Sequence, residues 1–303
     1  MRRLQKHSGF TAVEVLLVFV MLALLLMLLV PALQTSRQAA RQTECLNRLH
    51  QIGIALQNYE TVMRVLPPGC VNADAPIQNE ADGYHMSWIV QLLPMMDQEN
   101  LFETIDWTYG AYATNNAIAG VSAPYYFQCS SDPNHSASMM SAGSSYAGCI
   151  GGTSRAIDVD NTGLLYLNSS IDDIRIPDGR SNTLVVGEVR ISSTLTESGL
   201  SWSSGTAATL RSSGLPLNST DDSMYEIITS ESGGFGSWHE GTATMLFADG
   251  SAKAMSDKTD LELLILLGDR ADGQMAELPA SATDRRIRNI QHRASVRIPD
   301  KLP

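Results

Sequence analysis

The sequence predicts an α+β fold in which a long N-terminal helical stem packs on an antiparallel β-sheet head. A long apolar run followed by apolar residues at three- and four-residue spacing is typical of one helix, which we expect over residues 10–63. Beyond residue 70 the pattern changes to short apolar runs separated by turns. An Asp-Gly pair between two such runs predicts a β-hairpin.

The composition is that of a globular protein with an acidic surface. Of the 303 residues, 44% are hydrophobic and 17% charged, and the net charge is −11. This charge argues against nucleic acid as a partner, because phosphates need basic patches. Basic residues gather at the two ends: Arg2, Arg3 and Lys6 at the start, and five arginines and one lysine against three acids in residues 276–303. We expect the C-terminal stretch to be a solvated, disordered tail.

The apolar run predicts a transmembrane helix over residues 10–30. No polar side chain occurs from Val15 to Val30, and about twenty residues suffice to cross the hydrocarbon core. The basic residues ahead of the run favour a cytoplasmic N-terminus. A secretory signal peptide would have a shorter apolar core with a small-residue cleavage site, which this run lacks. Glu14 stands out, because a carboxylate at the edge of hydrocarbon is costly without a partner.

Residues 31–63 are expected to continue the helix as an amphipathic segment. Pro31 removes one backbone hydrogen bond and predicts a bend, not a break. From Phe10 to Tyr59 the stem would be about 75 Å long at 1.5 Å per residue. Its apolar stripe consists of Leu46, Leu49, Ile52, Leu56 and Tyr59.

The head is expected over residues 64–275. Residues 183–188 predict a buried strand, and residues 244–255 predict a hairpin that turns at Asp249-Gly250. Three further elements are predicted: a helical turn covering the sheet at 98–107, a long surface loop in the Ser-, Gly- and Thr-rich residues 203–234, and a short terminal helix at 257–267.

The segment Gly9-Phe10-Thr11-Ala12-Val13-Glu14 resembles the processing signature of type IV prepilins and pseudopilins. The resemblance implies that a membrane peptidase removes the basic leader 1–9 after Gly9 and methylates the new amino terminus of Phe10. Glu14 would then pair with the Phe10 amine of a neighbouring subunit and set the axial stagger of otherwise smooth apolar helices. Pro31 lies where these proteins commonly bend the helix. The alternative for Glu14 is a charge that snorkels toward the headgroups.

Further motifs resemble the bacterial domain of unknown function 1559, which is described as prepilin-like and has no established enzymatic activity. The family's hallmark is His239, followed after nine residues by Asp249-Gly250. The chain departs from the family at His239-Glu240-Gly241, where Pro-Gly-Gly usually follows the histidine. The resemblance covers roughly residues 9–272, and its other motifs are Cys45–Tyr59, Leu66–Gly69, Cys129–Asp132, Ser144–Gly148, Asp178–Thr183 and Gly187-Glu188.

The chain has four cysteines, Cys45, Cys70, Cys129 and Cys149, which form no C-x-x-C and no zinc-like cluster with histidines. Metal binding through thiolates is therefore not expected. An exported head makes one or two disulfides plausible, and the sequence alone allows three complete pairings. The family resemblance places cysteines at Cys45 and Cys129, which implies that these two pair; Cys70 and Cys149 would then form a second pair particular to this chain. The alternative is four small buried thiols.

A weak calcium candidate lies at Asp158, Asp160 and Asn161, where oxygen-bearing side chains precede a glycine. The acid expected at the twelfth position of a calcium loop is absent, since Ser169 stands there. Some pseudopilins use calcium to stiffen a loop. The alternative is a solvated turn.

His239 and Asp249 invite a catalytic interpretation with Ser237 or Ser251 as nucleophile. A hairpin could bring the histidine and the aspartate together. No nucleophile elbow or oxyanion loop accompanies them, and a structural role in a strand and a turn explains both. We therefore expect no catalytic residues.

These observations predict a non-enzymatic structural subunit of a type IV pilus-like or type II secretion pseudopilus-like filament. Its expected partners are the prepilin peptidase/methyltransferase, other pilin-like subunits through the stem, and the bacterial inner membrane, with no nucleic acid and no firm cofactor. Before assembly it would span the inner membrane once, with the head in the periplasm. The alternative is a membrane-tethered envelope protein that never polymerises and has a ligand-binding or hydrolytic head.

Overall fold

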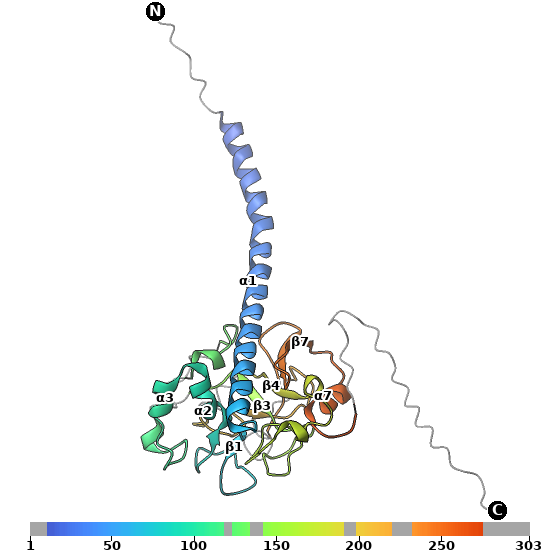
Figure 1. The fold of residues 1–303 in the computed structure, drawn as a ribbon. Helices are drawn as coiled ribbons and strands as arrows, with labels where there is room; N and C mark the ends of the chain where they lie inside the picture. The colour runs from blue at the N-terminus through green and yellow to red at the C-terminus, as the bar shows by residue number, and fades with distance from the viewer. Residues whose placement is uncertain (1–10, 118–122, 134–141, 191–197, 220–231, 275–303) are drawn as a thin grey trace, which may run out of the picture.

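The chain forms a long helical rod that runs into a rounded head (Figure 1). The computed structural model describes residues 11–117, 123–133, 142–190, 198–219 and 232–274. The expected leader 1–9, Phe10 and the expected tail 276–303 lie outside these residues. The helices are α1 (Ala12–Met63), α2 (Trp88–Leu92), α3 (Glu99–Glu103) and α7 (Leu261–Gly268), with 3-10 turns η1 (Leu93–Met96), η2 (Thr114–Asn116), η3 (Tyr125–Phe127), η4 (Asp173–Arg175) and η5 (Arg180–Asn182). The strands are β1 (Cys70–Val71), β2 (Met86–Ser87), β3 (Tyr146–Cys149), β4 (Leu184–Glu188), β5 (Leu210–Arg211), β6 (Thr242–Phe247) and β7 (Ala252–Ser256).

Helix α1 is continuous from the N-terminal apolar run into the head, as predicted. Pro31 lies inside the helix without ending it, which is consistent with the loss of a single backbone hydrogen bond. At the start, Thr11 and Glu14 form a capping box, in which each side chain bonds the backbone N–H of the other residue. At the end, Arg64 adopts a left-handed conformation with φ 67°.

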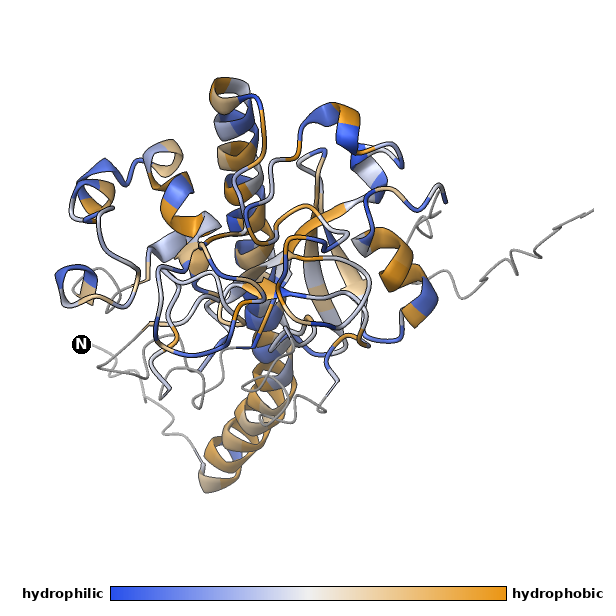
Figure 2. Cartoon of the chain, turned by 90° about the horizontal axis from the view of Figure 1, so that it is seen from below, coloured by the Kyte–Doolittle hydropathy of each residue, from blue (hydrophilic) through white to orange (hydrophobic). Residues whose placement is uncertain are grey.

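The two halves of α1 have different surroundings. All side chains from Ala12 to Arg41 are exposed, and Figure 2 shows this protruding half as mostly hydrophobic. The second half is buried along one stripe, which confirms the predicted amphipathic pattern, although Leu46 is only half-buried. The buried residues of α1 are Cys45, Arg48, Leu49, Ile52, Gly53, Ala55, Leu56 and Tyr59.

The head is built on a five-stranded sheet of order β5-β3-β4-β6-β7. Neighbouring strands are antiparallel except β3 and β5, which are parallel, so the sheet is mostly and not wholly antiparallel. The predicted strand at 183–188 is β4, and the predicted hairpin is β6–β7 with Asp249-Gly250 between them. A separate two-stranded pairing joins β1 and β2.

The sheet has a hydrophobic core on each face. Alternate residues of β6 point to opposite faces, because side chains alternate along a strand. Leu246 belongs to the core that includes the buried stripe of α1, whereas Met245 and Phe247 belong to the core that includes α7. The sheet is therefore a middle layer between the stem helix on one face and α7 on the other.

Two expectations for the head were wrong. Helix α3, within the predicted turn 98–107, buries none of its residues and packs on η1 instead of covering the sheet. The predicted surface loop at 203–234 is in its described part largely internal: residues 201–213 are all buried, and β5 lies among them. Small side chains permit this close packing, since a Cβ at Gly205 would lie 2.4 Å from the Cβ of Cys70. Hydroxyls satisfy local backbone groups, as where Thr209 Oγ1 donates to the Ser204 carbonyl at 2.6 Å.

A charge clamp fastens the end of α1 to the sheet. The Arg180 guanidinium donates to both carboxylate oxygens of Glu60 on α1, with Nη1–Oε1 at 2.8 Å. It also donates to the Asp173 carboxylate and to the Ala248 carbonyl, both at 3.1 Å. The Arg180 and Glu60 side chains are only 26% and 16% exposed, so these contacts are less screened than ordinary surface pairs.

Replacing Arg180 by Ala is expected to lower the free energy of unfolding by about 1.5–3 kcal/mol, because the half-buried Glu60 loses its charged donors. The matched control is Arg175→Ala. Arg175 pairs with Asp172 at 3.7 Å and its side chain is 58% exposed, so its loss is expected to cost less than about 0.5 kcal/mol. Urea denaturation of both variants measures the difference, and equal losses would contradict a clamp at Arg180.

Candidate functional site at the junction of stem and head

Strand β6 runs beside α1, and side-chain amides of α1 bond the hairpin near both ends of β6. Gln42 Nε2 donates to Thr242 Oγ1 at 3.1 Å, and Gln57 Nε2 donates to the Asp249 carbonyl at 2.9 Å. The helix advances about 22 Å between the two glutamines, at 1.5 Å per residue. The chain from Thr242 to Asp249 advances about 23 Å, at 3.3 Å per residue. The two lengths match, so β6 can run alongside α1 between the two amide contacts.

The Asp-Gly end of the family motif packs against α1. Gly250 has φ +85°, a conformation that favours glycine, and a Cβ there would lie 2.4 Å from Gln57 Nε2. A Cβ on the facing Gly53 would lie 3.0 Å from Leu246 Cδ1 and 3.5 Å from Gly250 Cα. Asp249 shapes the turn, since its Oδ1 accepts from the Ser251 N–H at 2.8 Å. This half of the motif is a close contact between backbone and helix.

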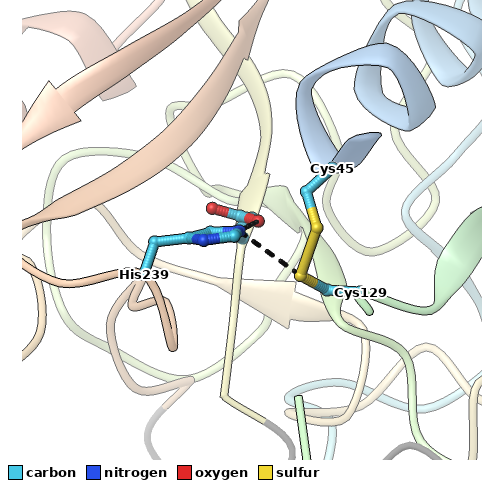
Figure 3. A group of neighbouring side chains, drawn as sticks. Cys45, Cys129 and His239 are labelled. Atoms are coloured by element: carbon cyan, nitrogen blue, oxygen red, sulfur yellow. Dashed lines mark hydrogen bonds and ion pairs between the residues drawn. A yellow bond between two sulfur atoms is a disulfide. The ribbon is translucent and has the colours of Figure 1, made fainter. Parts of the chain in front are cut away.

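The histidine end of the motif meets a disulfide. Cys45 of α1 and Cys129 are bonded, with Cα atoms 5.6 Å apart, so the pairing predicted for these two cysteines is present. Figure 3 shows the His239 ring directed at this bond, and His239 Nε2 lies 3.5 Å from Cys129 Sγ. His239 is buried, and its backbone N–H is fixed by Ser237 Oγ at 3.0 Å.

Glu188 completes this cluster; the Gly187-Glu188 motif in the sequence indicated no role for it. It ends β4 and is 1% exposed. Its Oε2 accepts from the Thr244 N–H at 2.7 Å, while its Oε1 lies 3.5 Å from His239 Nε2 and has no hydrogen-bond partner. A buried carboxylate oxygen without a hydrogen bond is costly, and the facing His239 ring is the nearest group that could carry a counter-charge. We name Cys45, Cys129, Glu188 and His239 the junction cluster.

The prediction of a disulfide between Cys70 and Cys149 is wrong, because both thiols are free and buried. The two residues belong to different cores: Cys70 lies in the core on the α1 face of the sheet and Cys149 in the core on the α7 face. The sheet therefore lies between them. Burial raises the pKa of Cys149 to about 12 and raises that of Cys70 even further above the ordinary range, so both stay protonated and inert.

The hairpin does not bring His239 and Asp249 together, contrary to the geometry that a catalytic interpretation requires. They lie at opposite ends of β6, His239 at the disulfide and Asp249 beside Gln57. Ser237 and Ser251 each make a local backbone contact within two residues, to His239 and Asp249 respectively. No catalytic triad forms from these four residues.

The calcium candidate is a hydrogen-bonded turn. Asn161 is buried, its Oδ1 accepts from the Asp158 N–H at 2.7 Å, and its amide donates to the Ala156 carbonyl at 3.2 Å. The Asp158 Oδ1 accepts from the Val159 N–H at 2.7 Å, and Asp160 pairs with Arg155 at 2.8 Å. The expected turn accounts for these contacts, and calcium binding stays a prediction.

Replacing Gly250 by Ala is expected to destabilise the protein more than replacing Gly241. Both glycines have positive φ, +85° and +69°, so both variants share the backbone strain. Only at position 250 does a Cβ meet a neighbour, because nothing lies within 4 Å of Gly241. The new methyl displaces the Gln57 amide from the Asp249 carbonyl, which adds about 1 kcal/mol. Chemical denaturation measures the difference, and equal stabilities would contradict the contact.

Protein purified without reductant is expected to show no reactive thiol while folded and two after denaturation. The two are Cys70 and Cys149, whose burial keeps them protonated in the fold. Reduction before denaturation should raise the count to four. Thiol titration and mass spectrometry of unreduced peptides test this. A peptide that joins Cys70 to Cys149 would contradict the separation of the two cores.

A family model described as a protein of unknown function (DUF1559) matches residues 34–262, from the last exposed turns of α1 into α7. No curated protein and no solved structure matches the chain. The matched region contains the docked half of α1, the sheet, the junction cluster and the complete His-x9-Asp-Gly motif. The chain belongs to the DUF1559 family.

Proposed function

We propose that the chain is a structural subunit of a type IV pilus-like or type II secretion pseudopilus-like filament, without catalysis of its own. Before assembly, α1 would anchor it in the bacterial inner membrane with a cytoplasmic N-terminus. The observation that supports this most is the protruding half of α1. The described chain has one helix long and apolar enough to cross a membrane, and its apolar window is not buried in the protein.

The protruding half needs an apolar environment that the head does not provide. From Ala12 to Leu33 it is about 33 Å long, which matches a hydrocarbon core of about 30 Å. Each large apolar side chain gains about 1.5–3 kcal/mol on full burial, so the exposed row amounts to tens of kcal/mol. Lipid would bury this surface before assembly. Stems of neighbouring subunits would bury it in a filament.

Glu14 is the only charged residue from position 12 to position 36 and would supply the register of such stems. In the folded chain it also caps α1: its Oε2 accepts from Thr11 N at 2.8 Å and from Thr11 Oγ1 at 3.0 Å. A carboxylate has two oxygens, so the cap and a neighbour's ammonium can share it. Cleavage after Gly9 by a prepilin peptidase would create that ammonium on Phe10. The assembly role is therefore compatible with the cap.

An exported head fits the remaining chemistry. A disulfide between α1 and the head persists in an oxidising compartment such as the periplasm. The head would face the periplasm before assembly and the filament surface afterwards, and its partners would be other pilin-like subunits through the stem.

Glu14→Gln is expected to abolish assembly while leaving the helix intact. Glutamine can still accept the capping hydrogen bonds but carries no charge for a neighbour's amine. An ammonium left without its partner in an apolar environment costs about 3–5 kcal/mol, enough to reduce assembly by more than ~100-fold. Co-expression with the filament machinery and recovery of sheared filaments measure assembly. Filaments formed normally by Glu14→Gln would contradict a charge-dependent role.

Two controls separate the cap from the charge and test processing. Thr11→Ala removes the capping hydroxyl and keeps the carboxylate, so assembly should persist. Gly9→Val should block the peptidase and leave the leader attached, which intact-mass measurement detects. N-terminal sequencing of the wild-type protein should find methylated Phe10. A chain that keeps its initiator methionine and stays an anchored monomer would favour a tethered envelope protein.

A further inference from the structure

We propose that the junction cluster binds one zinc ion when its two cysteines are reduced. Its four residues come from separate parts of the chain: α1, the segment after η3, the end of β4 and the segment before β6. All four are buried, and one ligand atom from each lies within 4.8 Å of the other three. The site requires neither cleavage nor assembly, but it does require a reductant such as a dithiol, which supplies two electrons and two protons and splits the Cys45–Cys129 bond into two thiols.

The spacing of the ligand atoms fits a tetrahedral zinc ion. Zinc bonds sulfur at about 2.3 Å and nitrogen or oxygen at about 2.0–2.2 Å, which places neighbouring ligand atoms roughly 3.3–3.8 Å apart. His239 Nε2 lies 3.5 Å from Cys129 Sγ and 3.5 Å from Glu188 Oε1. These two separations are therefore already zinc-like, and all the ligand atoms lie within 4.8 Å of one another. The sulfur pair must open to about 3.8 Å, which side-chain rotation permits between Cα atoms 5.6 Å apart.

The donor set selects zinc over the hard cations. Two thiolates and an imidazole suit zinc, whereas calcium and magnesium require mostly oxygen ligands. Each cysteine thiol loses a proton when its sulfur binds the metal, so two protons are released. The ion would also bind Glu188 Oε1 directly, an oxygen that otherwise has no hydrogen bond and only a 3.5 Å contact with His239 Nε2.

Surrounding hydrogen bonds already orient the ligands. The Thr244 N–H holds Glu188 Oε2 at 2.7 Å and leaves Oε1 directed at His239. The Cys129 N–H donates to Ser145 Oγ at 2.8 Å, and the Tyr146 hydroxyl donates to the Cys45 carbonyl at 3.2 Å. Such outer contacts fix the positions of metal ligands and strengthen binding. The arrangement is a preformed site in which only the sulfurs move.

The test uses the full chain in detergent micelles, with Cys70 and Cys149 replaced by Ala so that Cys45 and Cys129 are the only thiols. The protein is reduced with a phosphine, stripped of metal and titrated with zinc or cobalt(II) without oxygen. We expect one equivalent of zinc to bind in competition with a chromophoric chelator. Cobalt should give the thiolate charge-transfer and intense d–d absorption of a tetrahedral site.

Variants identify the ligands. His239→Ala and Glu188→Gln are each expected to weaken zinc binding at least ~10-fold, with Glu188→Gln preserving side-chain volume. The matched controls are His50→Ala and Glu240→Gln, which change the same residue types outside the cluster and should leave affinity unchanged. Circular dichroism checks that each variant is folded.

The cobalt spectrum of the reduced protein decides the question even where a ligand variant fails to fold. Absence of thiolate charge transfer at one equivalent would overturn the proposal. Equal zinc affinity in folded His239→Ala, Glu188→Gln and the two controls would overturn it as well.

Discussion

The packing of one stripe of α1 on the sheet is the contact on which the rest of the structure depends. Because α1 is one continuous helix, the same backbone that is fixed in the head also sets the direction of the protruding half. Leu49, Ile52 and Leu56 are each at most 3% exposed, and burial of each contributes about 1.5–3 kcal/mol. A free apolar rod has no preferred direction, whereas a rod fixed along such a stripe presents Glu14 at a defined place.

The family motif is explained largely by this contact. The residues between His239 and Asp249 run along α1. The nine-residue spacing of the motif therefore sets where the hairpin meets the helix. Gly250 permits the approach to Gln57 and Asp249 shapes the turn, which are structural roles. The histidine end differs, because docking alone does not require a buried imidazole beside a buried carboxylate with an unpartnered oxygen. Chemistry is therefore a more natural explanation for His239 than for Asp249.

The sequence predicted what is encoded locally. The apolar stripe of α1, strand β4 and the Asp-Gly hairpin depend on residue spacing within one element, and all three are confirmed. The capping box at Thr11 and Glu14 was missed although Thr-x-x-Glu is its local signature. The buried stretch at residues 201–213 was missed because its small polar residues have the composition of a loop. Only tertiary packing shows that small side chains let this backbone enter the core.

Local sequence patterns could not predict which side chains from distant parts of the chain come together. The ligand atoms of the junction cluster come from Cys45, Cys129, Glu188 and His239, so no spacing rule for zinc fingers or C-x-x-C motifs could detect them. The failed pairing of Cys70 with Cys149 has the same origin. Both are buried cysteines, and only the sheet topology shows that they belong to different cores. Pairing the two remaining cysteines assumes that every cysteine forms a disulfide. A buried cysteine can instead remain a free thiol.

The proposed filament role, in which α1 is pulled out of a membrane, gives the position of the junction cluster a mechanical meaning. Cys45 is the first fully buried residue of α1, so a load applied to the protruding half reaches this point before the rest of the docked stripe. A disulfide, or a metal bound by both α1 and the head, resists such a load. Hydrophobic packing alone would let α1 separate from the head one helical turn at a time. The Arg180–Glu60 clamp lies near the opposite end of the docked half. Strong contacts thus lie at both ends of the packed stripe of α1. The stronger one, the junction cluster, lies at the end next to the protruding half.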